Sequence, residues 1–420
     1  MAEEVIVVQG GMPLTGTIKV GGAKNSVLKL MAASLMTSGV TVLENVPAIS
    51  DVFLMVQVLE TLGAKVEKGD HSLTIDTTTV DSYRAPYELV AKMRASTAVL
   101  GPLIARFGQA EVAMPGGCKI GTRKLDLHFS GLESLGAEFE LDHGYINAST
   151  PHGLHGAKIF MDFPSVGATE NLMMASCFAE GTSVIENAAR EPEIVDLACF
   201  LNEMGAQVEG AGSPTITVQG VKELHPVTHR TCGDRIEAGT FLCAGALCGG
   251  PLRVEGIDPS FLEMALAKLR ETGCNLDVEK DAITISHRGP FKPFDIQTLP
   301  HPGFPTDLQA QFMAIAVLAQ GTSVISENVF ENRFMFADEV RRMGADITIE
   351  GHHAIVTGVD RLSGAQVASP DLRGGAALVL AGLVAEGETC ISSIEHIDRG
   401  YEDLTGKLSA VGARISRATI

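Results

Sequence analysis

The sequence of 420 residues lacks the features that mark several classes of protein. It has no tryptophan and few aromatic residues, and its eight cysteines include no CxxC pair. A structural zinc site is therefore not expected, and the cysteines are expected to be thiols in a reducing compartment. No stretch reaches the ~18 consecutive apolar residues that a membrane span needs. The amino-terminal MAEEVIVVQGG carries two acids where a signal peptide would be basic, so we expect a cytoplasmic protein.

Positive charge is also scarce. The chain has 32 basic against 51 acidic residues, a net charge of −19. This balance argues against nucleic acid as a partner, because such binding relies on basic patches. A small anionic substrate remains possible, since a few clustered arginines and lysines can outweigh a distant net charge.

What the chain does have is an internal repeat of about 70 residues. Short tags such as LGAKVE, MGAQVE and MGADITIE recur six times. Their glycines are Gly63, Gly136, Gly205, Gly273, Gly344 and Gly412. A second glycine precedes each tag by 23 to 28 residues, at Gly39, Gly108, Gly181, Gly249, Gly321 and Gly387. Six such units are too much chain for one core, which predicts two domains of three units each.

Each unit has the same predicted order. An apolar helix closed by glycine is followed by a β-branched strand, an amphipathic helix closed by the tag glycine, and alternating strands. Helices that are apolar on most faces are buried on all sides. We therefore predict an α/β fold with buried helices surrounded by sheets. The first domain would hold residues 23–232, and the second residues 1–22 and 233–420, with the opening strand completing the last unit. The alternative is two unrelated α/β domains.

Basic residues interrupt the repeat at helix starts. Lys24 and Asn25 open the first helix of unit one, Arg94 that of unit two and Arg373 that of unit six, while Arg399 lies at the second helix of unit six. Helix N-termini attract anions, and arginine suits bidentate contacts with phosphate or carboxylate. Each residue could instead be an ordinary exposed cation, with Asn25 as a helix cap. Their equivalent positions favour convergence on one anion site, in the cleft between the domains.

Asp307, in HPGFPTDLQAQ, opens the first helix of unit five after two prolines. Aspartate commonly caps a helix there. The functional alternative is a carboxylate that acts as a general base.

The segment PGGCKIGTR, residues 115–123, replaces a compact turn of unit two with a longer glycine-rich loop. Long glycine-rich loops often act as lids. Lys119 and Arg123 would favour the reactive thiolate of Cys118. The alternative is a turn with an incidental thiol.

The motifs VGGAKNS, PGGCKIGTRKLDLH, SVGATEN, AAREPEIVDLA, HPGFPTDLQAQF, ENVFENRFM, LSGAQV and HIDRGYE follow one another along the chain. In order and spacing the chain resembles the UDP-N-acetylglucosamine 1-carboxyvinyltransferase family of enolpyruvyl transferases, over essentially its whole length. The resemblance implies a two-domain inverted α/β barrel of six units. It also implies transfer of the enolpyruvyl group of phosphoenolpyruvate to the 3′-hydroxyl of UDP-N-acetylglucosamine, with release of phosphate. The reaction opens peptidoglycan precursor synthesis and needs no cofactor or metal.

The resemblance assigns roles to residues already singled out. Cys118 would protonate the enol methylene and Asp307 would deprotonate the sugar hydroxyl. Lys24, Arg123 and Arg399 would hold phosphoenolpyruvate. The residues that would contact or enclose the UDP-sugar are Asn25, Arg94, Arg123, Lys124, Leu125, Asp126, Leu127, Ser165, Val166, Gly167 and Val329. The family's epoxide inhibitor fosfomycin would react with Cys118. A monomer or weak homo-oligomer is expected, with no nucleic acid or membrane partner.

One departure concerns Phe163, where some members of the family have a lysine near the diphosphate. Phosphate contacts would then come from Lys124 or from backbone N–H groups. Two other functions remain open at this point. One is a 5-enolpyruvylshikimate-3-phosphate synthase-like transferase, and the other is a nucleotide-sugar binding protein without catalysis.

Overall fold

The structure is a computed structural model, and it describes residues 3–85, 87–90, 94–114 and 125–420. The chain divides into two compact units. The first unit holds the described residues from Gly22 to Cys232, and the second holds those up to Gly21 and from Gly233 to Ile420. Each unit has its own hydrophobic core.

The first unit contains three four-stranded sheets, with strand orders β14-β3-β5-β4, β6-β7-β9-β8 and β10-β11-β13-β12. Their strands are β3 (Val40–Glu44), β4 (Lys65–Gly69), β5 (Ser72–Asp76), β6 (Arg84–Ala85), β7 (Gln109–Ala113), β8 (Glu138–Asp142), β9 (Tyr145–Ser149), β10 (Lys158–Phe160), β11 (Thr182–Glu186), β12 (Gln207–Glu209), β13 (Thr215–Gln219) and β14 (Thr228–Arg230). The helices are α1 (Lys24–Ala33), α2 (Ser50–Thr61), α3 (Tyr87–Val90), α4 (Leu100–Phe107), α5 (Asp126–Ser134), α6 (Val166–Ser176) and α7 (Pro192–Glu203), with the 3-10 helices η1 (Ser34–Met36) and η2 (Arg94–Val99).

The second unit repeats this arrangement, with strand orders β22-β23-β1-β24, β16-β17-β15-β2 and β18-β19-β21-β20. Its strands are β1 (Glu4–Gln9), β2 (Gly16–Lys19), β15 (Leu252–Glu255), β16 (Asn275–Val278), β17 (Ala282–Ser286), β18 (Ile296–Gln297), β19 (Thr322–Ser326), β20 (Asp346–Glu350), β21 (His353–Thr357), β22 (Gln366–Ala368), β23 (Glu388–Ser392) and β24 (Arg414–Thr419). The helices are α8 (Arg235–Cys248), α9 (Glu263–Glu271), α10 (Gln309–Ala316), α11 (Ala337–Arg342), α12 (Leu372–Val384), α13 (Glu395–Asp398) and α14 (Leu404–Ala410), with η3 (Pro259–Leu262) and η4 (Thr306–Leu308).

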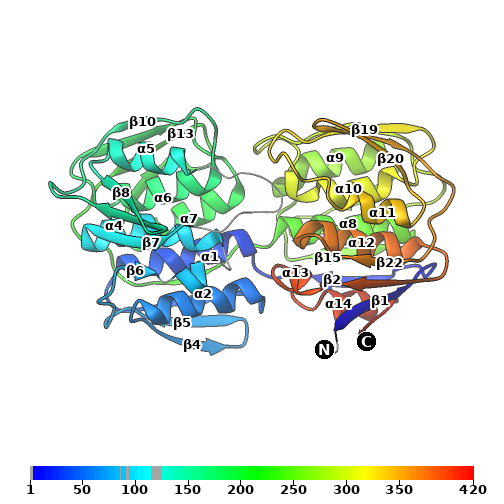
Figure 1. Cartoon of the computed structure of the whole chain (residues 1–420), viewed down its shortest axis with the longest axis horizontal. Coiled ribbons are helices and arrows are strands. Elements are labelled where there is room, and N and C mark those ends of the chain that lie inside the picture. The colour runs from blue at the N-terminus through cyan, green and yellow to red at the C-terminus, as the bar shows by residue number, and fades with distance from the viewer. Residues whose placement is uncertain (1–2, 86, 91–93, 115–124) are drawn as a thin grey trace. The chain divides into compact units, whose positions relative to one another are not determined.

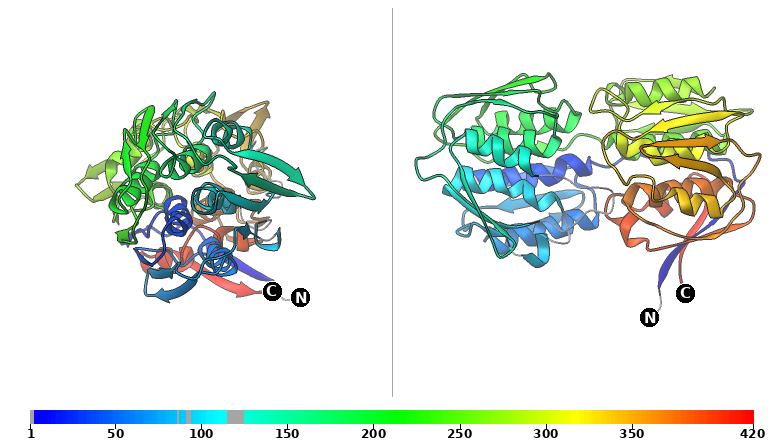
Figure 2. Two further views of the ribbon diagram at one scale, coloured as in Figure 1. Left: turned by 90° about the vertical axis from the view of Figure 1, so that its left-hand side faces the viewer. Right: turned by 45° about the horizontal axis from the view of Figure 1, so that its top comes forward.

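In each unit the apolar helices lie inside and the sheets lie outside (Figure 1). The left-hand view of Figure 2 shows helices of the first unit near the middle and strands around them. Helix α8 is buried continuously from Arg235 to Ala246, as a helix with no polar face must be. The predicted α/β fold with helices enclosed by sheets is confirmed.

The repeat also explains how the chain ends are used. β1 pairs antiparallel with β23 and β24. It takes the position in its sheet that a strand of the same repeat takes in the other five sheets. The expected completion of the last repeat by the opening strand is therefore confirmed for β1. β2 instead pairs in parallel with β15 of repeat four, and β14 pairs in the same way with β3 of repeat one.

The tag glycines have nearly identical backbones. Their φ angles lie between +98° and +109°, a region that side chains with a Cβ rarely adopt. The first glycines depart from the predicted helix-capping role in four of the six repeats. Gly108 and Gly249 do cap α4 and α8. In the other four repeats the α-helix ends earlier, because a 3-10 turn or irregular residues separate it from the glycine, as η1 does before Gly39.

Candidate active site

Asp307 of the second unit lies between two arginines. It belongs to η4, which starts after the cap residue Pro305 and leads into α10. Its Oδ1 accepts a hydrogen bond from Arg333 Nη2 at 2.7 Å, and its Oδ2 accepts from Arg373 Nη2 at 3.0 Å and Nε at 3.3 Å. The Asp307 side chain is 24% exposed, whereas both arginines are buried. The Asp307 side chain is therefore partly accessible, and two buried guanidinium groups compensate its charge.

Arg373 is held from several sides. It lies in the first turn of α12, which is capped by Asp371 through the backbone N–H groups of Arg373 and Gly374. Its guanidinium lies 5.4 Å from the centre of the Tyr401 ring. Burial lowers the pKa of Arg373, but Tyr401, Asp307 and Asp234 outweigh burial and raise the pKa above its ordinary value. Arg373, predicted to bind substrate, thus contacts Asp307 as a permanent cation.

Glu327 organises the loop beside Asp307 and was not singled out from the sequence. Its buried carboxylate accepts hydrogen bonds from the hydroxyls of Thr298 and Thr306, both at 2.8 Å. It also accepts from the backbone N–H of Val329 at 2.9 Å. Arg333 Nη1 donates to the Thr306 hydroxyl at 3.1 Å. Glu327 and Arg333 both belong to the ENVFENRFM motif, which was the available signal.

Arg399 directly follows α13 and is half-buried, as is Val329. Two residues later, Tyr401 is buried and anchors this segment. Its hydroxyl lies 2.8 Å from Thr240 Oγ1 of α8 and accepts from Gln311 Nε2 of α10 at 3.2 Å. The segment carrying Arg399 is therefore tied to two central helices.

In the first unit, Lys24 is the first residue of α1, as predicted. Its ammonium lies 3.1 Å from Asp51 Oδ2, and Asp51 is buried in the first turn of α2. Asn25 follows it and is half-buried. The ion pair directs Lys24 along the start of α2.

Asn171 of α6 joins the other candidate segments of the first unit. Its Oδ1 accepts from Gly101 N of α4 at 2.7 Å, and its Nδ2 donates to Thr97 O of η2 at 3.2 Å. The same amide lies 3.1 Å from His128 Nδ1 and 3.3 Å from Gly167 O. Burial lowers the pKa of His128 to about 4, so the imidazole is neutral at pH 7 and accepts from the amide. Asn171 thus brings η2 and the starts of α5 and α6 together.

The starts of η2, α5 and α6 carry residues that were predicted to contact the UDP-sugar. Arg94 begins η2, Leu125 caps α5, and Asp126 and Leu127 open it. Ser165 caps α6 by accepting from Ala168 N, and Val166 and Gly167 follow. Three predicted residues, Cys118, Arg123 and Lys124, lie outside the described residues.

Another buried ion pair links α1 to α6. Lys29 Nζ lies 2.7 Å from Glu170 Oε2. Burial raises the pKa of Glu170 to about 7, against the opposing charge of Lys29. The sequence pointed to neither residue as functional, although Glu170 lies in SVGATEN. Their partnership joins the corresponding first helices of repeats one and three, which are far apart in sequence.

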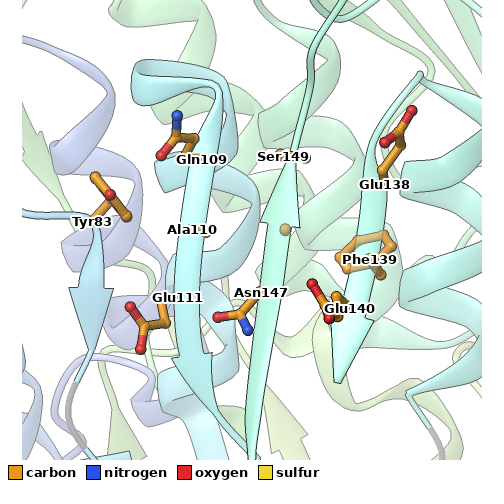
Figure 3. Close-up of a pocket in the computed structure, with 10 residues that line it drawn as sticks. Tyr83, Gln109, Ala110, Glu111, Glu138, Phe139, Glu140, Asn147 and Ser149 are labelled. Carbon is orange, nitrogen blue, oxygen red and sulfur yellow. The ribbon is translucent and has the colours of Figure 1, made fainter. Parts of the chain in front are cut away.

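A shallow pocket of about 380 Å³ opens on the outer sheet of β6, β7, β8 and β9. Figure 3 shows Glu111, Glu138 and Glu140 along its strands, with Tyr83 and Phe139 beside them. Three glutamates disfavour an anionic ligand. The helix starts with their lysines and arginines are the better candidates.

Within the described parts of the chain, seven cysteines are free thiols, and no group of three or more His, Cys, Asp or Glu residues is arranged to hold a metal. Among the same residues, no helix is both long and apolar enough to span a membrane.

The fold defines a class of protein. The enolpyruvyl transferase NikO from Streptomyces tendae superposes with a TM-score of 0.89 at 26% identity, covering all of both chains. An EPSP synthase from Acinetobacter baumannii superposes with a TM-score of 0.77 at 17% identity, over 99% of this chain and all of the other, which supports the fold alone. The architecture is that of the enolpyruvyl transferases.

The chain belongs to the EPSP synthase (3-phosphoshikimate 1-carboxyvinyltransferase) family, whose model matches residues 8–408. It is 53% identical to UDP-N-acetylglucosamine 1-carboxyvinyltransferase 1 of Caldanaerobacter subterraneus subsp. tengcongensis, over 98% of this chain and 99% of the relative. It is also 53% identical to UDP-N-acetylglucosamine 1-carboxyvinyltransferase 2 of Staphylococcus saprophyticus, over 99% of each. The resemblance noted in the motifs is confirmed.

Proposed function

We propose that the protein transfers the enolpyruvyl group of phosphoenolpyruvate to the 3′-hydroxyl of UDP-N-acetylglucosamine and releases phosphate. The full-length identity to enzymes of that name supports this choice of substrates. The geometric observation that carries the chemistry is the Asp307 carboxylate between Arg333 and Arg373. The reaction would open peptidoglycan precursor synthesis, in a cytoplasmic monomer or weak homo-oligomer.

Asp307 fits the role of a general base. Each carboxylate oxygen has about two lone pairs, so an oxygen that already accepts from an arginine can accept a further proton. The two guanidinium groups fix its orientation, and its partial exposure leaves a path for a hydroxyl group. The sugar hydroxyl would lose its proton there as its oxygen attacks C2 of the enolpyruvyl group.

Addition also needs an acid that protonates the methylene carbon and cations that bind the phosphate and carboxylate. Cys118 would protonate the methylene carbon, which makes C2 electrophilic enough for attack. Lys24, Arg123 and Arg399 would offset the charges of phosphate and carboxylate and align the substrate. The tetrahedral product of addition then loses a proton from the methyl group and phosphate from C2, giving the enol ether.

Phosphate release from the purified chain tests the proposal. Release should require phosphoenolpyruvate and UDP-N-acetylglucosamine together, and shikimate 3-phosphate should not replace the nucleotide sugar. Release with shikimate 3-phosphate would favour the EPSP synthase activity instead. Binding of both substrates without release would favour a nucleotide-sugar binding protein.

Cys118 provides a second test. Cys118→Ala should abolish most turnover while UDP-N-acetylglucosamine still binds by calorimetry. Fosfomycin should add covalently to the wild-type thiol and leave Cys118→Ser unmodified by mass spectrometry. Unchanged turnover in Cys118→Ala would remove the thiol from the mechanism.

A further inference from the structure

A buried polar cluster lies in the first unit beside two positions where the described chain passes between units. Those passages are at Gly21–Gly22 and Cys232–Gly233. Inside the first unit the two segments are hydrogen-bonded to each other, because Ala23 N donates to Cys232 O at 2.7 Å. Ala23 is the cap residue of α1, so the returning segment contacts the helix start that carries Lys24 and Asn25.

Asp196 of α7 connects these segments through one carboxylate. Its Oδ2 accepts a hydrogen bond from the hydroxyl of Ser26, in the first turn of α1. The same oxygen accepts from Cys232 N at 3.3 Å. The side chain of Asp196 is 10% exposed and Ser26 is fully buried. A single buried carboxylate therefore ties the start of α1 to the returning segment.

His229 of β14 completes the cluster. Its Nε2 lies 3.2 Å from Asp196 Oδ1, and its Nδ1 lies 2.7 Å from Glu203 Oε2. A neutral imidazole has one N–H, so two carboxylate neighbours call for the doubly protonated ring. Burial lowers the pKa of His229, but the hydrogen bonds to Asp196 and Glu203 outweigh burial and raise the pKa above its ordinary value. The ring also packs edge-on against Phe200, which fixes its plane.

We infer that Asp196 and His229 are positioning residues for the proposed reaction: through Ser26 and Cys232 they fix the first turn of α1, and with it Lys24 and Asn25. Neither residue lies among the candidate substrate contacts. The inference rests on the proposed function for its kinetic consequence, because Lys24 is the residue that would hold phosphoenolpyruvate. Its structural consequence, an ordered start of α1, can be measured without turnover.

Asp196→Asn is the main variant. The amide keeps the size of the side chain but loses the negative charge, so its hydrogen bonds from Ser26 and Cys232 are weaker and its NH2 group cannot accept from the protonated His229. We expect the KM for phosphoenolpyruvate to rise about tenfold, the change that corresponds to one hydrogen bond to a charged group. The KM for UDP-N-acetylglucosamine should change less, because only Asn25 of its proposed contacts lies on α1, whereas those at the starts of α5 and α6 are held by Asn171.

Glu203→Gln is the matched control. Glu203 also contacts His229, at the shorter distance, but it is half-exposed and, among the residues that the structure describes, makes no hydrogen bond to α1 or Cys232. The KM for phosphoenolpyruvate should stay within about twofold of wild type. An equal rise in both variants would mean that only the charge of His229 matters, and would overturn the assignment of Asp196.

Hydrogen exchange separates this inference from the proposed function. Ser26 N and Val27 N both donate to Ala23 O, so the peptide covering residues 22–30 reports on the start of α1. Its exchange should accelerate in Asp196→Asn and not in Glu203→Gln, whether or not the enzyme turns over. If Asp196→Asn fails to fold, Ser26→Ala removes one of the same hydrogen bonds and should give a weaker change in the same direction. Wild-type exchange in the folded variants would overturn the inference, whereas a wild type that releases no phosphate would overturn only the proposed reaction.

Discussion

Each unit buries one glutamate beside a lysine, and the two pairs differ in what else holds the carboxylate. In the first unit Lys29 pairs with Glu170 at 2.7 Å. In the second, Lys407 pairs with Glu237 at 2.6 Å, and Glu237 also accepts from Gly21 N at 2.8 Å. Burial raises the pKa of both glutamates, but Gly21 helps Lys407 to favour the charged form of Glu237.

The same contrast extends over the candidate site. The carboxylate of the second unit, Asp307, is held by two arginines, which stay charged at every accessible pH. The first unit instead buries groups whose pKa is shifted upward, with Glu170 at a pKa of about 7 and the pKa of His229 above its ordinary value. Repeats with one backbone plan therefore carry different electrostatics, and the polar side chains at their helix starts make the difference.

The largest effect is expected when the Asp307 carboxylate of the second unit is removed. Asp307→Asn should lower kcat about 10²- to 10⁴-fold, the range for loss of a general base, while UDP-N-acetylglucosamine still binds. Phosphate release and calorimetry measure the two effects. Asp338→Asn, an exposed aspartate in the same unit that pairs with Arg341, is the control and should be as active as wild type. A kcat close to wild type in Asp307→Asn would place the chemistry elsewhere.

The buried glutamates give the next test, through stability against pH. A pKa raised on folding from 4.5 to about 7 means that Glu170 supports stability below pH 4.5 and that this support is lost as pH rises through 7. At about 1.4 kcal/mol per pKa unit, the loss of stability is at most about 3.5 kcal/mol. Denaturant unfolding between pH 5 and 8 should show this fall in the free energy of unfolding in wild type and not in Glu170→Gln.

Glu237→Gln sharpens this test. Gly21 and Lys407 both favour the charged form of Glu237. Glu237→Gln should therefore change the slope of the unfolding free energy against pH less than Glu170→Gln does. Parallel curves for wild type and Glu170→Gln would show that the first unit has no titrating pair, and the contrast between the units would fail.

A smaller effect is expected when the geometry of an arginine changes and its charge does not. Arg333→Lys keeps the positive charge beside Asp307 but loses the fork that contacts Asp307 and Thr306 together. Loss of one hydrogen bond to a charged group should lower kcat about tenfold, or about 1.4 kcal/mol. Arg341→Lys, at the exposed pair with Asp338, should change nothing in the same assay. Equal activity of both variants would mean that charge alone holds Asp307.

Local signals were enough to predict part of this molecule. The tag glycines and the apolar helices show the repeats, and Lys24 and Asp307 stand out because they open helices that are otherwise apolar. The partners of these residues could not be predicted in the same way. Asp307 and Arg373 are 66 residues apart, and Asp196 and His229 are 33 apart, so only the packing of different repeats brings them together. A repeat period predicts backbone, whereas pairs of polar side chains depend on tertiary contacts.

The smallest expected effect concerns Phe163, where the resemblance to the family leads us to expect a lysine in some members. Phe163 is 43% exposed, and its carbonyl accepts from the backbone N–H of Ser165, the cap of α6. Phe163→Lys would add a positive charge beside a helix start that is proposed to approach the diphosphate. An exposed charge pair contributes about 0.2–1 kcal/mol, so the KM for UDP-N-acetylglucosamine should fall about two- to threefold at low salt, with kcat unchanged.

Salt and a matched variant identify the cause of that change. The Debye length is about 8 Å at 0.15 M ionic strength and shorter above it, so the gain should fade as salt is added. Phe160→Lys adds the same charge at a more exposed position on β10 and should leave the KM unchanged. If both variants lower the KM equally, the effect comes from net charge. If Phe163→Lys has no effect at low salt, the diphosphate is not near the start of α6, and the first unit binds the nucleotide through other helix starts.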